Sequence, residues 1–555
     1  MIPRRWLKLS LILALLAIAG VNHLVQERLT ERRLTLTDAP PLENAPPALA
    51  LSVVVLGGFR GLLADMLFLR QGKMQTNGNY FELVQLARWT IQLQPRFTEA
   101  ISYSVWNLAY NVSVNFSQPE ERWRWVNAAI ELVRDEALPQ HPGDPKLYQQ
   151  LGWIYQHKIG QNLDDMNYYY KRQVALQMIE MLGSGPYDWQ ALAEAPQDPD
   201  AMVAALGDDA AEFAAALHQE GLSLSGLEQS FRESATLPPA IAEFAKRRKC
   251  DELLVLYLRS RWLLSKSLDP VVLYEIDQHY GPLDFRTAQA HGIYWAYQGL
   301  KHTPDGSEVF LECERMIFHC MSRSVEIGRV SYLPDTTLKI HLSPNLDIVD
   351  EAREAYLNAI KNHDRNGGIK SGYVNFMIDC IRALYIGGRT EDAQRFLEIM
   401  RSSKYAEGSE RFVRSLDEFV LIELEEDVNA GGEHQALPNI SGFLQEAFSA
   451  LGRRDFKTAS NWESLAQRSY SKYQTQFKSE RDTKRRGLPP YTTMKQVALQ
   501  QIQLNEPAVF HSLYTELQRL AAKRGDTLEG DGAPTQERDL LEGLLGGDSE
   551  QIQRN

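Results

Sequence analysis

The chain has 555 residues, which is long enough for three or more domains of ordinary size or for one extended repeat array. Its 44% hydrophobic and 24% charged residues are typical of a globular protein. The formal net charge of −13 argues against a nucleic-acid partner, because binding to a phosphate backbone needs clustered Lys and Arg. Four scattered cysteines do not form a disulfide framework, and we expect Cys313 and Cys320 to be buried on one helix.

The amino terminus has the layout of a signal-anchor. Arg4, Arg5 and Lys8 precede an apolar run from Leu9 to Val21. The basic residues favour a cytoplasmic N-terminus, so residues 1–26 are predicted to cross the bacterial inner membrane once and to leave the body on the periplasmic side. A cleaved secretory signal is the alternative interpretation of the same pattern.

The next segments connect this predicted anchor to the body. Residues 27–47 contain the proline-rich stretch PPLENAPP and are predicted to form a stiff linker. The apolar segment from Ala48 to Leu69 is interrupted by Arg60 and Asp65, and charges are costly in hydrocarbon unless they are paired. We therefore expect a buried or interfacial first helix of the body instead of a second membrane span.

A helix with a strong apolar stripe is predicted after Asp144. Tyr148, Leu151 and Tyr155 recur at i, i+3 and i+7, which places their side chains on one face of a helix. Gly152 lies beside that stripe, and a glycine in a helix lowers helix propensity. The expected compensation is the close approach of a neighbouring helix.

This spacing resembles the tetratricopeptide repeat, a helix-turn-helix unit of about 34 residues whose first helix carries a large residue, Leu-Gly and Tyr. Tyr148, Leu151, Gly152 and Tyr155 occupy those places, and IGGRTEDAQRFLEIM is similar to a turn and second helix. The spacing between units departs from the motif, which implies irregular repeats. The N-terminal third also resembles an uncharacterised family of membrane-anchored bacterial envelope proteins, through LGGFRGLLADMLFLR, NYFELVQLARWT and WNLAYNVS.

The remainder of the chain predicts further helices with one exception. Residues 183–239 are rich in Ala and Asp and have weak periodicity, which indicates a small inserted helical module. Leu338, Ile340 and Leu342 follow a two-residue period after a Pro-Asp turn, so a small β-hairpin is expected near 330–342.

Together these patterns predict an all-α protein: an irregular tetratricopeptide-like α-hairpin solenoid with one small β-hairpin and an N-terminal transmembrane helix. The predicted divisions are 1–26 signal-anchor, 27–47 linker, 48–182 N-terminal tetratricopeptide-like helical domain, 183–239 Ala-rich inserted module, 240–345 central helical region with the β-hairpin, 346–524 C-terminal tetratricopeptide-like repeats, and 525–555 flexible tail.

The sequence contains no recognised catalytic signature, since GxSxG, HExxH, the P-loop and the dinucleotide fingerprint are all absent. We therefore predict neither a catalytic residue nor a metal or cofactor. His291 could line a pocket with Tyr294 and Trp295, although a lone helix histidine is usually structural. Asp164 and Asp165 are expected to cap a helix, because carboxylates that are neighbours in the chain point apart.

A binding groove is the remaining prediction. The resemblance to a tetratricopeptide array implies a concave groove lined by first-helix residues that do not pack into the core. The same large side chains could instead pack against adjacent helices, and the sequence leaves both interpretations open. The groove residues that the register indicates are Gln149, Trp153 and Gln156 in the clearest unit, Trp106 and Tyr110 before it, and Arg382 and Tyr385 after it.

Two functions are compatible with these features. The first is a membrane-anchored helical-repeat scaffold, not an enzyme, which mediates protein–protein interaction in a bacterial cell envelope. The alternative is an envelope hydrolase that acts on a glycan or lipid through a pocket near His291 or His319. The scaffold is favoured because helical repeats need no catalyst and the hydrolase lacks a motif.

Overall fold

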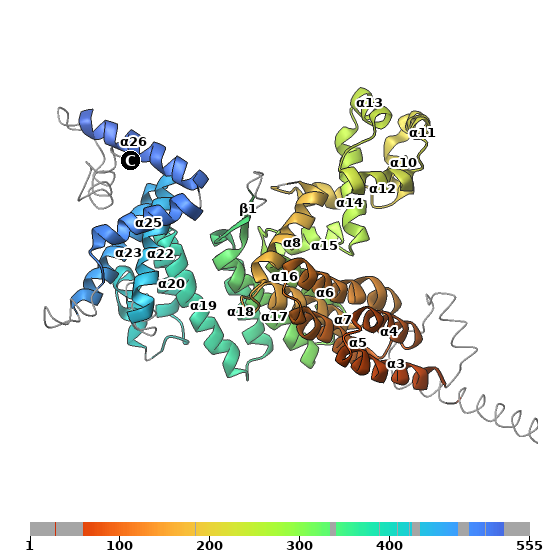
Figure 1. Ribbon diagram of the computed structural model, residues 1–555, viewed down its shortest axis with the longest axis horizontal. Helices are drawn as coiled ribbons and strands as arrows, with labels where there is room; N and C mark the ends of the chain where they lie inside the picture. The colour runs from red at the N-terminus through yellow and green to blue at the C-terminus, as the bar shows by residue number, and fades with distance from the viewer. Residues whose placement is uncertain are drawn as a thin grey trace, which may run out of the picture. The chain divides into compact units, whose positions relative to one another are not determined.

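The structure of the protein is a computed structural model in which helices predominate, with one two-stranded antiparallel sheet (Figure 1). This confirms the predicted all-α class. The predicted signal-anchor, the predicted linker except residue 28, and nearly all of the predicted tail lie outside the described residues. Among the helices that are described, none combines the length and the apolar composition required to cross a membrane. The structure describes residues 28, 59–183, 185–332, 340–387, 389–407, 409–420, 422–423, 433–475, 488–505 and 507–526.

The chain divides into two compact units, and one of the boundaries between them falls within helix α6 (Pro119–Glu131). Unit 1 comprises residues up to Val112 together with Trp125–Gly143, and unit 2 comprises Ser113–Arg124 and everything from Asp144. Besides its part of α6, unit 1 contains α3 (Phe59–Thr76), α4 (Tyr80–Leu93), α5 (Thr98–Trp106), the helical turns η1 (Asn107–Val112) and η3 (Leu132–Ala137), and the short turn η4 (Leu138–Gln140).

Helix α3 of unit 1 packs along α4. Its inner face carries Ala64, Gln71 and Met74, which are all buried. The Gln71 amide donates to Thr90 Oγ1 on α4 at 3.2 Å and accepts from Ser104 Oγ on α5 at 2.7 Å. Because these bonds are buried, they fix the rotation of α3 about its own axis.

Unit 2 begins with the helices that contain the predicted repeat, continues through a small cluster of short helices, and then returns to longer ones. Helices α11 and α13 pack together, and α12 and α13 pack on α14. The bounds in this part are η2 (Ser113–Asn115), α7 (Pro145–Trp153), η5 (Ile154–Ile159), α8 (Asn167–Leu182), α9 (Trp189–Glu194), α10 (Pro199–Leu206), η6 (Gly207–Asp209), α11 (Ala210–Gln219), α12 (Leu224–Ser234), α13 (Pro239–Arg248), α14 (Asp251–Ser265), α15 (Pro270–Tyr280), α16 (Ala288–Lys301) and α17 (Glu308–Ile327).

The second half of unit 2 consists of successive helices that pack on their neighbours in the chain. Helix α17 packs on α18, α18 on α19, α19 on α20, and α19 also contacts α23. Helices α22, α23, α25 and α26 enclose an apolar core that includes Leu444, Phe448 and Leu513. The bounds are η7 (Leu346–Ile348), α18 (Val349–Asn362), α19 (Gly367–Ile386), α20 (Thr390–Arg401), η8 (Glu410–Val413), α22 (Glu433–Gly452), α23 (Phe456–Thr475), α25 (Tyr491–Asn505) and α26 (Pro507–Asp526).

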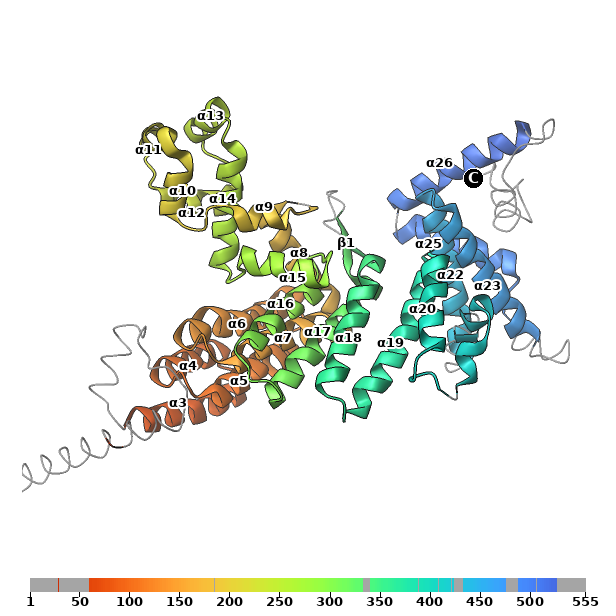
Figure 2. The ribbon, with the colours of Figure 1, turned by 180° about the vertical axis from the view of Figure 1, so that it is seen from behind.

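The predicted apolar stripe of α7 packs as its spacing indicates. Asp144 caps the helix by accepting a hydrogen bond from the Lys146 backbone N–H at 2.9 Å. Leu151 is fully buried, and the Tyr155 ring stacks on the His291 ring of α16 with 4.8 Å between centroids. Helices α7, α16 and α17 lie side by side in both ribbon views (Figures 1 and 2).

Glycines allow this close packing. A Cβ atom at Gly152 would lie 3.2 Å from the side chain of Met316 on α17 and 3.4 Å from the carbonyl oxygen of Gly292 on α16. At Gly292, a Cβ would lie only 2.7 Å from Cys320 Sγ. The predicted close approach at Gly152 is therefore confirmed, and so is the prediction that Cys313 and Cys320 are buried helix cysteines.

The predicted β-hairpin is present. Strand β1 (Arg329–Tyr332) pairs antiparallel with β2 (Ile340–Ser343), with Val330 opposite Leu342. Val330 and Ile340 are buried and pack with Ala175 of α8. The connection between the strands, including Leu338, lies outside the described residues.

Candidate interaction surface

The predicted groove residues of unit 1 lie at the junction of α5 and η1. Trp106 is the last residue of α5 and is 45% exposed. Its ring stacks on the ring of Tyr110 one turn later, with 5.8 Å between centroids. The two rings form one aromatic patch on the surface of this unit.

The three predicted residues of the clearest repeat lie on α7 and η5 and differ in accessibility. Gln149 is buried, so it offers little surface to a partner. Trp153 is half-buried, and its ring stacks on the His157 ring at 4.5 Å. Gln156 is also half-buried and faces α16, because a Cβ atom at Gly292 would lie 3.7 Å from Gln156 Cβ.

The last two predicted residues lie on α19 and contact groups of their own unit. Arg382 Nη1 lies 3.4 Å from Asp379 Oδ1, and Tyr385 Oη donates to Asp417 Oδ1 at 2.6 Å. Burial, together with the Asp417 carboxylate, raises the pKa of Tyr385 to about 12. The structure therefore places these two residues on α19, three on α7 and η5, and the remaining pair in unit 1.

The two histidines of the hydrolase hypothesis occupy different environments. His291 is buried in α16, and its Nε2 lies 3.0 Å from the carbonyl oxygen of Phe285. His319 is exposed on α17, beside the ring of Phe318. The contacts of His291 are those of a core side chain held by its neighbours.

A buried ion cluster lies where η5 leads into α8. Asp164 Oδ2 accepts from Lys158 Nζ at 2.6 Å, and Asp164 Oδ1 lies 3.1 Å from Arg122 Nη1. Burial by itself raises the pKa of Asp164, but the hydrogen bonds from Lys158 and from the Met166 backbone, with the Lys158 charge, bring it below its ordinary value. The carboxylate is therefore ionised at neutral pH.

The expectation that Asp164 and Asp165 point apart is wrong. Arg122 Nη1 also lies 2.5 Å from Asp165 Oδ1, so one guanidinium draws both carboxylates to the same place. The predicted helix cap is not formed, because Met166 is the N-cap of α8 and no side chain caps it; Asp164 Oδ1 accepts instead from the Met166 backbone N–H at 2.9 Å, in the turn before the helix. The pair stabilises the start of α8 and has its charge compensated by Arg122 and Lys158.

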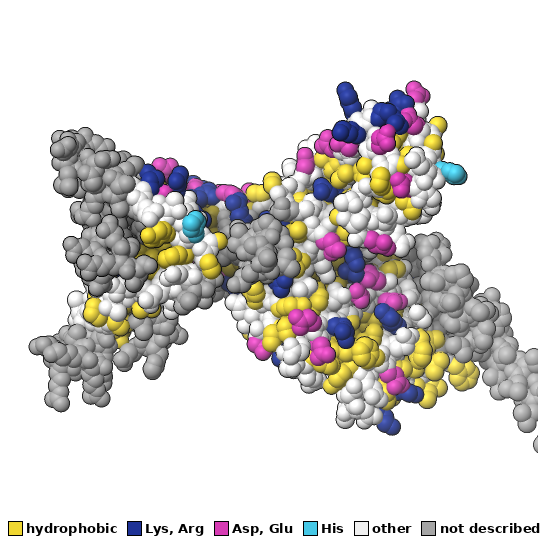
Figure 3. All heavy atoms as spheres, turned by 45° about the horizontal axis from the view of Figure 1, so that its top comes forward, with side chains coloured by type: hydrophobic (Ala, Val, Ile, Leu, Met, Phe, Trp, Pro, Cys, Tyr) yellow, Lys and Arg dark blue, Asp and Glu magenta, His cyan; other side chains and the backbone are white. Residues whose placement is uncertain are grey.

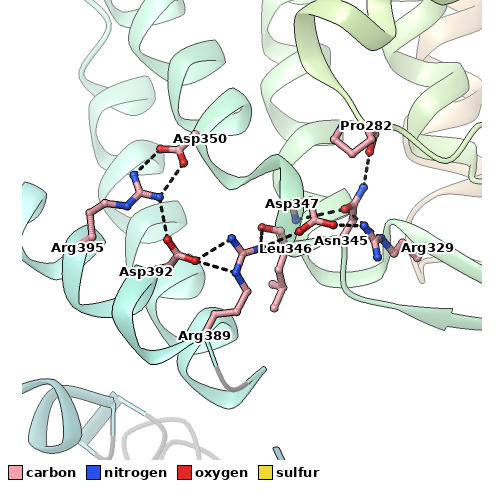
Figure 4. A network of polar contacts seen from close by, with 9 residues as sticks. All are labelled: Pro282, Arg329, Asn345, Leu346, Asp347, Asp350, Arg389, Asp392 and Arg395. Carbon is pink, nitrogen blue, oxygen red and sulfur yellow. Dashed lines mark hydrogen bonds and ion pairs between the residues drawn. The ribbon is translucent and has the colours of Figure 1, made fainter. Parts of the chain in front are cut away.

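A row of alternating charges connects the base of the β-hairpin with η7, α18 and α20 (Figure 4). At one end, Asn345 is almost fully buried; its amide donates to the Pro282 carbonyl oxygen at 2.8 Å and its Oδ1 accepts from Arg329 Nε at 3.2 Å. Each arginine in the row contacts at least one carboxylate. The ion pairs are Arg329–Asp347, Arg389–Asp347, Arg389–Asp392, Arg395–Asp392 and Arg395–Asp350.

An open pocket lies between α17 and the turn that joins α18 to α19. Its volume is about 740 Å³, and it is widely open to solvent. His363 Nε2 lies 2.5 Å from Glu314 Oε2 of α17, which holds the turn against that helix. The pocket is lined by Leu311, Lys361, Asn362, His363, Asp364, Arg365, Asn366 and Gly367.

The cations of this pocket differ from those of the charge row. Lys361 and Arg365 are exposed, and in the part of the chain that the structure describes neither forms an ion pair. Asp364 is compensated by Lys370, whose Nζ lies 3.0 Å away. The lining therefore presents two uncompensated positive charges and several amide groups.

This pocket was not predicted from the sequence. The segment KNHDRNGG shows a polar turn with two glycines, which is typical of any loop between helices. Its facing wall comes from Leu311, about 50 residues earlier in the chain, and Glu314 of the same helix holds His363. A single sequence gives no signal for that pairing.

Comparisons with known proteins add no assignment. No family model matches the chain, and neither the curated proteins nor the solved structures contain a match. Within the described residues, no group of three or more His, Cys, Asp and Glu side chains is placed to hold a metal ion.

Proposed function

We propose that this protein is a membrane-tethered helical scaffold of a bacterial envelope that binds a protein partner through the pocket at the α18–α19 turn. The single observation that carries the binding part is the pair of uncompensated cations, Lys361 and Arg365, at the rim of an open pocket of about 740 Å³. The partner is a protein with an acidic docking segment. No cofactor or nucleic acid is required.

The contrast within unit 2 supports a binding role for these cations. Arg389 and Arg395 are also partly exposed, yet each contacts two carboxylates. Lys361 and Arg365 are exposed and form no ion pair within the described residues. Charges left unpaired at the rim of a pocket can meet opposite charges on a partner, which increases association rate and selectivity.

The packing order supports a scaffold. From α16 to α20 each helix packs against the next helix of the chain, as in arrays of α-hairpins that present extended surfaces to partners. Irregular tetratricopeptide-like repeats are the proposed origin of this order. The tether is proposed from Arg4, Arg5, Lys8 and the apolar run that follows them.

Site-specific photo-crosslinking tests the proposal. A photoreactive amino acid replaces Asn366 in the full chain, and the adducts formed in intact cells are isolated from detergent-solubilised membranes and identified. The same position is then tested in a Lys361→Glu plus Arg365→Glu background. We expect one partner adduct in the parent chain and its loss by about tenfold or more in the reversed background, because like charges then face each other.

Matched reversals elsewhere provide the control. Lys246 and Lys249 on α13 and its end are also exposed cations. Lys246→Glu plus Lys249→Glu changes the net charge by the same amount and should leave the adduct unchanged. An adduct that survives the pocket reversal, or that disappears equally in both variants, would overturn the pocket as the docking site.

A further inference from the structure

One face of α3 in unit 1 is apolar and exposed. Its side chains recur at i, i+3, i+4, i+7 and i+10, which places them on one stripe of a helix. Their exposed fractions range from 38% to 74%. The stripe consists of Phe59, Leu62, Leu63, Met66 and Leu69.

The stripe cannot turn inward. The opposite face of α3 is held on α4 and α5 by Ala64, Met74 and the buried amide of Gln71. Asn107 Nδ2 adds a hydrogen bond to Gln75 Oε1 at 2.9 Å, one turn further along the same inner face. The apolar stripe is therefore a fixed outer surface of the unit.

We infer that this stripe lies on the lipid bilayer, with α3 parallel to the membrane surface. The inference rests on the membrane tether of the proposed function and extends it to a second contact. In Figure 3 hydrophobic side chains gather on the described surface at the lower right of the view. Helices with one apolar face and one packed or polar face bind at the boundary of headgroups and acyl chains.

The sequence before α3 supports a lipid occupant. The stretch Ala48–Leu56 (ALALSVVVL) contains no charge and leads directly toward Phe59. The predicted anchor, Leu9–Val21, lies on the same side of α3 in the chain. A helix that follows two apolar segments is kept near the bilayer that those segments favour.

The polar end of the stripe also suits a membrane surface. Arg70 and Lys73 continue the same face after Leu69, and both are exposed. Arg70 forms an ion pair with Glu82, whereas Lys73 has no ion-pair partner in the described part of the chain. Long basic side chains at the end of an apolar stripe can reach headgroup phosphates while their stems stay in the apolar layer.

A second copy of the chain fits this face less well. Stable protein interfaces use about 20–30 residues from each partner. The stripe supplies five side chains from a single helix. A bilayer needs no such area or shape complementarity, since it accepts any apolar face of sufficient length.

Depth-dependent fluorescence quenching tests the inference on the full chain. The partly exposed thiol is removed by Cys250→Ser, and the other three cysteines are buried. A single Met66→Cys carries a fluorophore, and the protein is reconstituted into phosphatidylcholine vesicles that contain lipids with nitroxides at known depths. We expect quenching that is strongest for nitroxides about 5–10 Å below the headgroups.

Controls separate this contact from the tether. Val203→Cys on α10 places the same label at an exposed apolar position of unit 2 and should be quenched only by aqueous iodide. Adding Leu62→Gln and Leu69→Gln to the Met66→Cys chain should abolish quenching by lipid nitroxides without releasing the protein from vesicles. Both replaced residues are more than half exposed, so unit 1 should stay folded.

Each outcome decides a different point. If the protein does not float with vesicles, the tether of the proposed function fails and this inference falls with it. If the protein floats but iodide quenches the Met66→Cys label as strongly as the Val203→Cys label, only the docking of α3 is overturned. A label protected from both iodide and lipid nitroxides would show that protein covers the stripe, which overturns the lipid occupant.

Discussion

The contact between Gly292 and Cys320 makes a quantitative prediction about the packing of α16 on α17. In Gly292→Ala the new Cβ atom would lie 2.7 Å from Cys320 Sγ, whereas nonbonded heavy atoms prefer about 3.5–4.0 Å. The helix cannot shift away, because Gln156 N and Cβ of η5 lie 3.6 and 3.7 Å from the same point on the other side. One side chain would therefore be compressed between two helices.

Two opposing effects determine how much Gly292→Ala changes the free energy of unfolding. Overpacking of a filled core costs about 1–3 kcal/mol. Alanine gains about 1 kcal/mol over glycine in helix propensity. We expect Gly292→Ala to lower the local free energy of unfolding by up to about 2 kcal/mol.

Removing the Cys320 sulfur should remove the destabilising effect of Gly292→Ala or turn it into a stabilising one. In a Cys320→Ala background the space occupied by Sγ is vacant, so Gly292→Ala should become neutral or stabilising by up to about 1 kcal/mol. Gly442→Ala on α22 is the matched control, because a Cβ there meets no atom within 4 Å. It should stabilise its helix by up to about 1 kcal/mol.

Native-state hydrogen exchange of peptides from α16, α17 and α22 is the appropriate measurement. The chain contains two units, so a single global transition would not report the local change. An equal effect of Gly292→Ala with and without Cys320 would refute the packing explanation. So would a stabilising effect in the chain that retains Cys320.

Two further predictions concern polar groups in unit 2. Asp164→Asn leaves buried Lys158 without its carboxylate and should lower the local free energy of unfolding by about 3–5 kcal/mol at pH 7, measured by native-state hydrogen exchange of peptides from η5 and α8. Because folding lowers the Asp164 pKa, its stabilisation is present above the ordinary Asp pKa of about 3.9 and is lost as pH falls through the lower folded value. The difference between the two proteins should therefore be constant from pH 7 to 5 and shrink near pH 3. Asn345→Ala removes buried hydrogen bonds and should lower the local free energy of unfolding by about 1–3 kcal/mol. Asp347→Ala removes a half-exposed carboxylate and should lower the same free energy by less than about 1 kcal/mol, and by less still in 1 M salt.

Local patterns in the sequence were sufficient where the structure depends on neighbours in the chain. The stripe of Tyr148, Leu151 and Tyr155 predicted a buried helix face, and Gly152 predicted the close approach that Met316 provides. The two-residue period around Ile340 predicted the only sheet found in the described part of the chain. In each case the period of the side chains alone determines which face is buried.

Interactions between distant segments could not be predicted in this way. Asp164 and Asp165 meet because Arg122, more than 40 residues earlier, reaches both of them. The arginines of the charge row find carboxylates as far as 45 residues away. Such pairings depend on which helices pack together, and a single sequence without related sequences carries no record of that choice.

Neither of the two proposed contact surfaces is compensated by other described residues of its own unit. Buried Lys158 has Asp164, and partly exposed Arg389 has two carboxylates, so these charges are satisfied within unit 2. The apolar stripe that includes Met66 and the cations at Lys361 and Arg365 have no counterpart of this kind among the described residues. They also differ in chemistry, since one needs an apolar medium and the other needs negative charge. A tethered scaffold requires both: a surface that keeps it at the bilayer and a second, separate surface that remains available to a partner.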